Sequence, residues 1–201
     1  MYNNERRIIC ITGADGSGKS TLVDGIKKEC PQAYEVSIWD MLANPAAKIF
    51  TSKKDIDDYL CLLSADARLL FLAHAMEAAM DMALRSDAPL LLINAYYYKY
   101  FSAEVLMGAN PALEKQLAGR MPVPDKTIYL HHAPALSAAR KTRFSKYECG
   151  CREATAANFI DFQNKVVMEF ERYIQPDWYL LDASHDVPTL SSMAIQFISP
   201  C

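Results

Sequence analysis

Apolar residues in this chain fall into short runs separated by longer stretches with helical spacing. Five short runs are typical of strands, four of them rich in β-branched or aromatic residues and one a continuous apolar run. These runs cover residues 7–12, 34–39, 89–93, 127–130 and 178–181. The helical spacing predicts helices over residues 19–29, 66–85, 135–143, 154–174 and 187–198.

The alternation of strands and helices continues from end to end of the chain. Such alternation predicts an α/β fold with one parallel sheet and helices on both of its faces. No repeat or linker interrupts the pattern, so we expect residues 1–201 to form a single domain. Residues 140–153 are polar, irregular and contain Gly150, and we expect them to form a short mobile lid.

Composition and charge narrow the classes of function. The chain is 51% hydrophobic and 22% charged, which allows an ordinary globular core. Its formal net charge is −3, and no basic run is dense enough to hold a nucleic-acid backbone. Residues 1–10 lack a signal peptide's apolar stretch, and no window is apolar enough to span a membrane. We therefore expect a cytoplasmic protein with no nucleic-acid or membrane partner.

The strongest chemical signal is a glycine-rich octapeptide directly after the first predicted strand. Residues 13–20 read GADGSGKS and fit the phosphate-binding pattern G-x-x-x-x-G-K-S. Glycines let the loop curl around a triphosphate, and the N-terminus of the next helix favours negative charge. We expect Lys19 to reach the β- and γ-phosphates of ATP and Ser20 to bind Mg²⁺. The predicted nucleotide-binding residues of this segment are Gly13, Asp15, Gly16, Ser17, Gly18, Lys19, Ser20 and Thr21.

The same segment resembles the opening of the thymidylate kinase family. Residues 13–21, GADGSGKST, share the family's G-x-D-G-x-G-K-S-T. Further matches follow in order along the chain, at LLSADAR (62–68), LLLINAY (90–96), IYLHHAPALSAARKTR (128–143) and LDAS (181–184). The resemblance implies a P-loop NTPase fold with a five-stranded parallel sheet. It also implies transfer of the γ-phosphoryl group of ATP to dTMP or a similar nucleoside monophosphate.

The resemblance assigns catalytic roles beyond Lys19 at four matching positions. Asp15 would contact the acceptor sugar or an acceptor hydroxyl, and Arg68 would reach the acceptor phosphate. Arg140 and Arg143 would close over the phosphoryl group in transfer, where arginines neutralise spreading negative charge. A solvated helix face is the alternative for each of these arginines.

A further match concerns the adenine end of the nucleotide. The segment LDAS looks like the family's strand-end loop that lies against adenine. Asp182 and Ala183 are therefore expected beside ATP, together with Arg140.

Two departures from the family's pattern concern the acceptor. The family's Asp-Arg pair after its third strand is here Asn94-Ala95, and its Arg-Glu-Pro after the second strand is replaced by residues 39–41. Neutral Asn94 supplies no carboxylate to orient the metal or the acceptor, which leaves Asp40 or Asp182 as alternatives. Because arginines around the acceptor are depleted, we expect dTMP to be a poor substrate.

For three further groups of residues, the sequence allows either a structural or a functional role. His131 and His132 would face opposite sides of a strand, so they cannot both bind one metal; core packing is favoured, and a ligand-facing role for one of them is the alternative. The aromatic residues of segment 96–101 either pack in the core or stack on the acceptor. Cys149 and Cys151 lack a second Cys/His pair with zinc spacing, so a metal or redox role is their minor alternative.

Three functions remain open at this point. The leading one is a thymidylate-kinase-like transferase that uses ATP and Mg²⁺ and takes a small-molecule nucleotide as its acceptor. A kinase for a nucleoside or another small alcohol is favoured by the depleted arginines. A nucleotide-binding protein without phosphotransfer is favoured by the loss of the Asp-Arg pair. A homodimer is left open as the assembly state.

Overall fold

Five parallel strands form the centre of the protein. The structure is a computed structural model that describes residues 6–42 and 50–199. The strands lie in the order β2-β3-β1-β4-β5. They are β1 (Arg7–Thr12), β2 (Ala33–Val36), β3 (Leu90–Asn94), β4 (Lys126–His131) and β5 (Tyr179–Asp182). The predicted α/β fold with a five-stranded parallel sheet is therefore confirmed.

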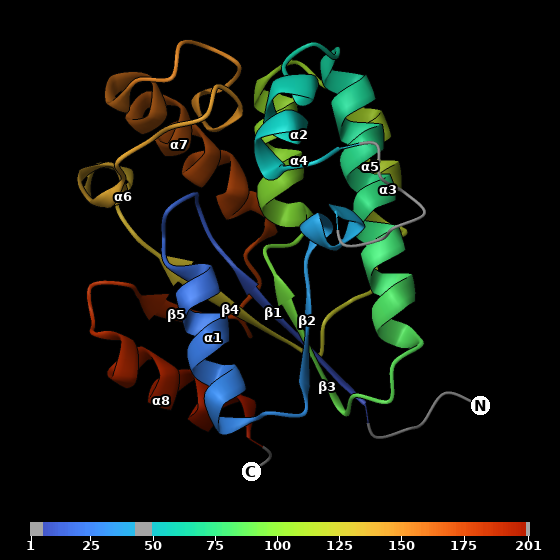
Figure 1. Cartoon of the computed structure of the whole chain (residues 1–201), viewed down its shortest axis with the longest axis vertical. Helices are drawn as coiled ribbons and strands as arrows, with labels where there is room; N and C mark the ends of the chain where they lie inside the picture. The colour runs from blue at the N-terminus through green and yellow to red at the C-terminus, as the bar shows by residue number, and fades with distance from the viewer. Residues whose placement is uncertain (1–5, 43–49, 200–201) are drawn as a thin grey trace.

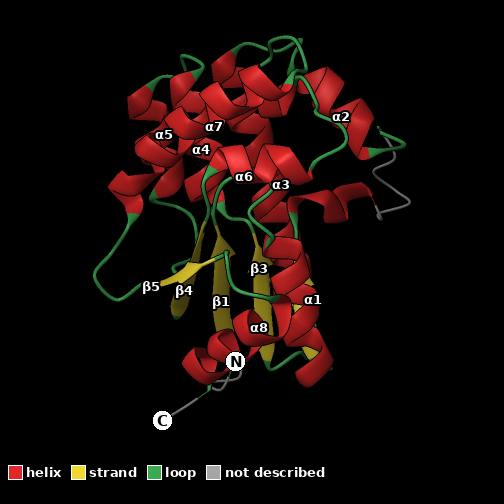
Figure 2. Ribbon diagram, turned by 90° about the vertical axis from the view of Figure 1, so that its left-hand side faces the viewer, coloured by secondary structure: helices red, strands yellow, loops and turns green. Residues whose placement is uncertain are grey.

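Helices cover the sheet and extend beyond it. The α-helices are α1 (Lys19–Glu29), α2 (Lys53–Leu60), α3 (Ala65–Leu84), α4 (Tyr97–Leu106), α5 (Pro111–Ala118), α6 (Pro134–Arg140), α7 (Ala156–Phe170) and α8 (Val187–Ile198). Helices α1 and α8 lie on one side of the sheet and α3 on the other (Figure 1). Helices α4 to α7 gather beyond one end of the strands (Figure 2). Among the described helices, none combines the length and apolar character needed to cross a membrane.

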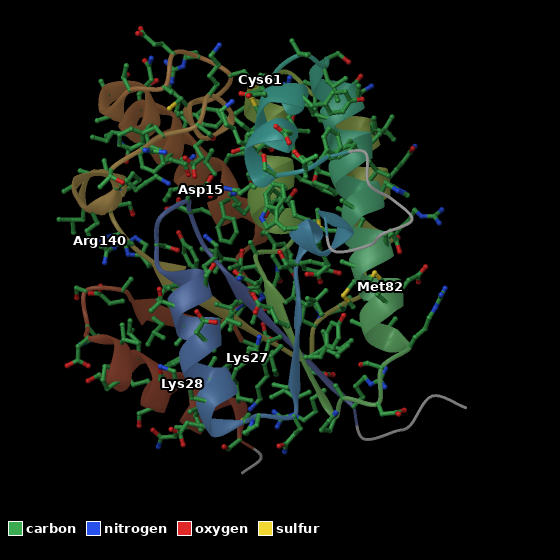
Figure 3. The ribbon with its side chains drawn as sticks, viewed as in Figure 1. Asp15, Lys27, Lys28, Cys61, Met82 and Arg140 are labelled. Carbon is green, nitrogen blue, oxygen red and sulfur yellow. The ribbon has the colours of Figure 1, made fainter. Side chains whose placement is uncertain are left out.

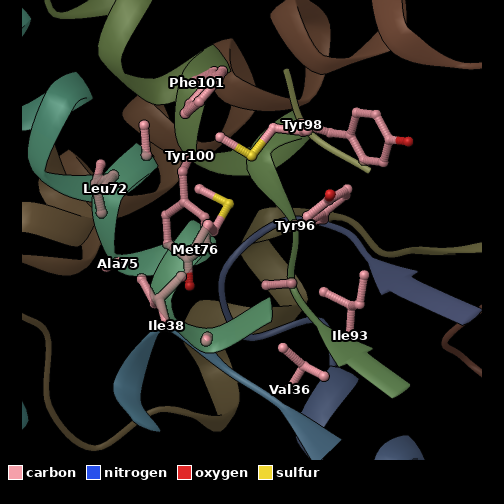
Figure 4. Close-up of a cluster of buried hydrophobic side chains, with 14 of the residues drawn as sticks. Val36, Ile38, Leu72, Ala75, Met76, Ile93, Tyr96, Tyr98, Tyr100 and Phe101 are labelled. Atoms are coloured by element: carbon pink, nitrogen blue, oxygen red, sulfur yellow. The ribbon is translucent and has the colours of Figure 1, made fainter. Parts of the chain in front are cut away.

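The core lies in two parts, one against each face of the sheet. Ile9 and Ile11 of β1 pack with α1 and α8, whereas Cys10 between them packs in the larger cluster under α3. Successive strand residues point to opposite faces, and burial of both faces explains the continuous apolar run. Tyr96 and Tyr98 also pack in the larger cluster (Figure 4). Core packing is therefore the interpretation that the structure supports for these two aromatic side chains.

Several element boundaries differ from the predicted ones. The strand expected over residues 34–39 ends at Val36, because a 3-10 helix takes over at Ile38–Leu42. Helices α2, α4 and α5 were not predicted. Most of α4 is buried, so its sequence shows no polar stripe, and α2 is a short polar helix that the side chain of Ser52 caps. Helix α6 ends at Arg140, three residues before the predicted end.

A buried ion pair joins α3, α4 and the segment that follows α6. Arg68 Nε donates to Glu104 Oε2 at 2.7 Å, and Tyr147 Oη donates to Glu104 Oε1 at 2.8 Å. Glu104 is 0% exposed and Arg68 is 6% exposed. Tyr147 and its neighbours Glu148 and Cys149 are buried in the middle of the proposed lid. This network therefore anchors that segment to the helices, and its mobility stays a prediction.

Replacing Arg68 by Met is expected to destabilise the fold strongly. The substitution leaves the buried Glu104 carboxylate without its cation, and breaking such a pair costs about 3–5 kcal/mol. Burial already raises the pKa of Glu104 although Arg68 opposes this rise. Protonation removes the unpaired charge at low pH, so the loss is expected to be larger at about pH 8 than at about pH 5.

Urea denaturation of the wild type and the variant measures this loss. Lys54→Met is the matched control, because its pair with Asp58 is exposed and should contribute little. A loss for Arg68→Met no larger than that of the control would contradict the expected role of the buried pair.

Candidate functional site

The loop between β1 and α1 (residues 13–18) is packed too tightly for side chains at two of its glycines. A Cβ on Gly13, where φ is 148°, would lie 2.5 Å from the carbonyl oxygen of Leu130 in β4. A Cβ on Gly16, where φ is 77°, would lie 2.9 Å from Cβ of Ser137 in α6. Both positions therefore require glycine, for space and for backbone conformation. Gly18, the second glycine of the motif, has space for a Cβ, but its φ of 100° favours glycine.

The N-terminus of α1 is arranged to receive an anion. The helix begins at Lys19 and has Gly18 as its N-cap, with no side-chain hydrogen bond at the cap. Its first N–H groups and its positive dipole end are therefore available to a phosphate. Lys19 Nζ donates to the carbonyl oxygens of Gly13 at 2.9 Å and Ala14 at 2.6 Å. Its ammonium group thus lies folded over the loop.

Asp15 stands at the tip of the loop (Figure 3) and pairs with a lysine from α4. Lys99 Nζ lies 2.7 Å from Asp15 Oδ1. Burial opposes the charge of Asp15, but Lys99 and Lys19 outweigh it and hold the pKa of Asp15 far below its usual value. Burial, with a smaller contribution from Lys99, lowers the pKa of Lys19 to about 7, although Asp15 opposes this shift. The loop lysine is therefore close to its titration midpoint at neutral pH.

A cavity of about 370 Å³ opens beside the loop. Its size is within the range of small-ligand sites. The loop and the start of α1 form one wall, and the other wall comes from the ends of β2 and β3 and from α2 and α4. The side chains of that second wall include Trp39, Lys53, Asn94, Lys99 and Tyr100. The cavity is thus lined by three lysines, counting Lys19, by two aromatic rings and by two carboxylates, those of Asp15 and Glu148.

A smaller cavity of about 80 Å³ lies on the other side of the loop. Arg140, Ala183 and His185 line it together with residues of the loop and α1. Figure 3 shows Arg140 on α6. An Arg140 Nη2 group donates to Nε2 of His132, and burial together with Arg140 lowers the pKa of His132. Neutral His132 therefore acts as a hydrogen-bond acceptor for Arg140.

The structure brings most of the predicted site residues together. The main cavity is lined by Asp15, Gly16, Gly18, Lys19, Ser20 and Thr21. Arg140 and Ala183 meet in the smaller cavity, next to Asp182, whose carboxylate accepts from the N–H of Ser184 at 2.8 Å. Arg143 is exposed and lines neither cavity.

Arg68 does not lie where the sequence predicted it. It lines neither the main nor the smaller cavity, although it was expected to reach the acceptor phosphate. Its guanidinium is held by Glu104 and donates to the carbonyl oxygen of Leu63 at 2.6 Å. The helical match could not reveal this, because Glu104 lies 36 positions away in the sequence.

The carboxylate of Glu35, and not that of Asp40 or Asp182, is linked to Ser20, through Asn94. Asp182 ends the far edge strand, and Asp40 accepts a hydrogen bond within its own turn. Asn94 Nδ2 instead donates to Ser20 Oγ at 3.1 Å and to Glu35 Oε1 at 2.8 Å. The alternation of side chains along β2 was the signal that could have placed Glu35 on the face covered by α1.

Two lysines that line the main cavity, Lys53 and Lys99, were not predicted from the sequence. Both belong to helices that it did not predict, and no motif marks them. Lys53 Nζ lies 5.2 Å from the ring centroid of Trp39, and its side chain is 51% exposed. Lys99 is 6% exposed. A single lysine within the aromatic run YYYKYF was the only available hint.

The residues at the loop suit a magnesium nucleotide. Mg²⁺ is usually held by one or two protein oxygens together with substrate phosphates. Ser20 presents an exposed hydroxyl, and the buried Ser17 Oγ has no hydrogen-bond partner within the described residues. Across residues 6–42 and 50–199, no three His, Cys, Asp or Glu side chains are placed to hold a metal ion by themselves. The donors therefore fit a metal that binds together with phosphates.

Comparison with known proteins agrees with this geometry. No protein-family model matches the chain. Over 200 residues the chain is 24% identical to a protein described as "Probable thymidylate kinase 1" from Saccharolobus solfataricus, covering 96% of this chain and 97% of that protein. A solved structure of thymidylate kinase from Candida albicans shares the fold with a TM-score of 0.69 and 15% identity, covering 96% of this chain and 91% of the other. The chain is thus similar over nearly its whole length to a probable thymidylate kinase, and it shares the fold of a solved thymidylate kinase.

Proposed function

We propose that this protein is an ATP-dependent kinase that transfers the γ-phosphoryl group to a nucleoside monophosphate. The observation that carries the proposal is the glycine loop with Lys19 folded over it, beside a cavity lined by further lysines. The full-length similarity to a probable thymidylate kinase supports a dTMP-like acceptor.

The nucleotide would bind along the loop, with its phosphates at the N-terminus of α1. Lys19 would leave the carbonyl oxygens of the loop and contact the β- and γ-phosphates. Mg²⁺, when bound at Ser20 with the nucleotide, supplies neutralising charge to the phosphates. The adenine end would lie toward the smaller cavity, where Arg140 and Ala183 meet. Arg143 lies three residues beyond Arg140 and would approach the phosphates if the segment closes.

The acceptor would occupy the main cavity. An acceptor monophosphate carries nearly two negative charges at neutral pH, and Lys53 and Lys99 provide cations on the wall opposite the loop. Trp39 and Tyr100 offer aromatic faces beside these lysines. Asp15 faces the same space and is held in its charged form by Lys99. These lysines would supply part of the positive charge that arginines provide around the acceptor in the thymidylate kinase family.

A kinase for a nucleoside or another neutral alcohol is the second candidate. The observation in its favour is the uncharged pair Asn94-Ala95, which lines the cavity where the family has Asp-Arg. An acceptor without a phosphate would not need the two lysines. The response of Lys53 variants therefore separates the two candidates.

Replacing Lys19 by Ala is expected to lower phosphotransfer by at least about a hundredfold and to weaken ATP binding, because the Lys19 ammonium group lies over the loop where the phosphates would bind, whereas Lys99 is paired with Asp15. A coupled assay with ATP, Mg²⁺ and a panel of monophosphates and nucleosides measures this loss. The panel includes dTMP, for which Asn94-Ala95 still predicts slow turnover. Lys28→Ala, at the other end of α1 (Figure 3), is the matched control. Unchanged binding and turnover in the Lys19 variant would remove the proposal.

Nucleotide binding is expected to take up a proton near pH 8. In the free protein the pKa of Lys19 is about 7, so much of the population is neutral at that pH. Phosphates favour the charged ammonium and raise this pKa, so affinity should fall as the pH rises above about 7. Titration calorimetry in two buffers of different ionisation enthalpy measures the uptake. Lys19→Arg stays charged and should show none. Identical apparent enthalpies for the wild type in both buffers would contradict the expectation.

Replacing Lys53 by Met is expected to lower kcat/KM for monophosphate acceptors by about tenfold or more. The lost contact is a charge-assisted hydrogen bond, worth about 1.5–3 kcal/mol. The KM for ATP should change little. Lys54→Met is the control, because the neighbouring Lys54 pairs with Asp58 and does not line the cavity. Equal kcat/KM values in both variants would favour the neutral acceptor.

A further inference from the structure

Glu35 and Asn94 lie on the same face of the sheet, close to the N-terminus of α1. In the pairing of β2 with β3, Glu35 stands opposite Leu92 and Val36 opposite Ile93. Leu92 belongs to the cluster under α1, whereas Val36 and Ile93 belong to the cluster on the other face. The period of two along each strand therefore directs Glu35 and Asn94 toward α1, where Ser20 lies.

These residues form a continuous chain of hydrogen bonds that ends at Ser20. Glu35 Oε2 accepts from Lys27 Nζ of α1 at 3.0 Å, and Glu35 Oε1 accepts from Asn94 Nδ2 at 2.8 Å. The same Asn94 nitrogen donates to Ser20 Oγ at 3.1 Å. If the amide of Asn94 were flipped, its oxygen would lie against the Glu35 carboxylate, where neither atom can donate a hydrogen bond. The carboxylate therefore sets the orientation of the amide. An N–H is thereby directed at the Ser20 oxygen.

The side chain of Glu35 is also open to water. It is 26% exposed, and its carboxylate retains lone pairs beyond the two hydrogen bonds that it accepts within the protein. Mg²⁺ keeps several bound waters in nucleotide sites, and their protons need acceptors. Carboxylates that do not bind the metal themselves can accept these hydrogen bonds, and they also orient the side chain that does bind it.

We propose that Glu35 is the positioning carboxylate of the magnesium site, acting from β2 in place of a carboxylate at the end of β3. It orients Ser20 through Asn94 and accepts hydrogen bonds from metal-bound water. The inference rests on the proposed function, because the metal enters with the nucleotide. It explains how a chain with neutral Asn94 keeps a negative charge beside Ser20.

The test compares ADP affinity with and without Mg²⁺ by titration calorimetry. Glu35→Gln is nearly isosteric and removes only the charge. In this variant, the ratio of ADP affinity with Mg²⁺ to ADP affinity without Mg²⁺ should fall about tenfold or more. Losses of this size are typical when a residue that orients a metal ligand is replaced. ADP affinity without Mg²⁺ should stay within about twofold of the wild type, because no nucleotide contact is lost. Adding Asn94→Asp to Glu35→Gln places a carboxylate directly beside Ser20 and should restore most of the Mg²⁺ effect.

Lys27→Met separates this role from a structural ion pair. It removes the salt bridge to Glu35 but leaves the carboxylate, so the Mg²⁺ effect should persist. If Lys27→Met reproduces the loss seen in Glu35→Gln, or if the double variant shows no recovery, the proposal is overturned. It is also overturned if Glu35→Gln keeps the full Mg²⁺ effect or loses metal-free ADP binding. Absence of any Mg²⁺ effect in the wild type would reject the proposed function itself, and this inference with it.

Discussion

Leu130 of β4 and Ser137 of α6 approach the backbone of the glycine loop so closely that a Cβ at Gly13 or Gly16 would collide with them. This contact holds the loop between the centre of the sheet and the helices beyond it. The position of α1, the direction of Lys19 and the exposure of Asp15 toward α4 all follow from the path of the loop. The packing that admits no side chain therefore also creates the concave backbone surface that suits phosphate.

Positive charge reaches the cavity from helices that are distant in sequence. Lys53 comes from α2 and Lys99 from α4, and both face the loop across the main cavity. A lysine ammonium is a compact charge on a flexible stem, whereas an arginine presents a rigid planar fork. Asp15 and Glu148 also line this cavity, so the lysines exceed the carboxylates by one. An anion that binds there would meet flexible ammonium groups and not the fixed bidentate geometry of arginines.

The resemblance to thymidylate kinases is carried by the glycine loop and by the shared fold. It is weakest around the acceptor. Arg68 keeps its place on α3 but binds the buried Glu104, and Tyr147 completes that pair. The same residue type at the matching position therefore serves the fold here, because a buried carboxylate must have a cation beside it.

The sequence alone determined the parallel α/β fold and the phosphate loop, because both depend on local patterns: the period of apolar residues and the glycine spacing. It could not reveal α4, whose buried aromatic residues show no polar stripe, nor its Lys99. It also could not assign the roles of Glu35 and Arg68, since each depends on a partner that chain folding brings near, Asn94 and Glu104. Only the tertiary structure decides which distant charges meet, because electrostatic interactions and hydrogen bonds act through space and leave no period in the sequence.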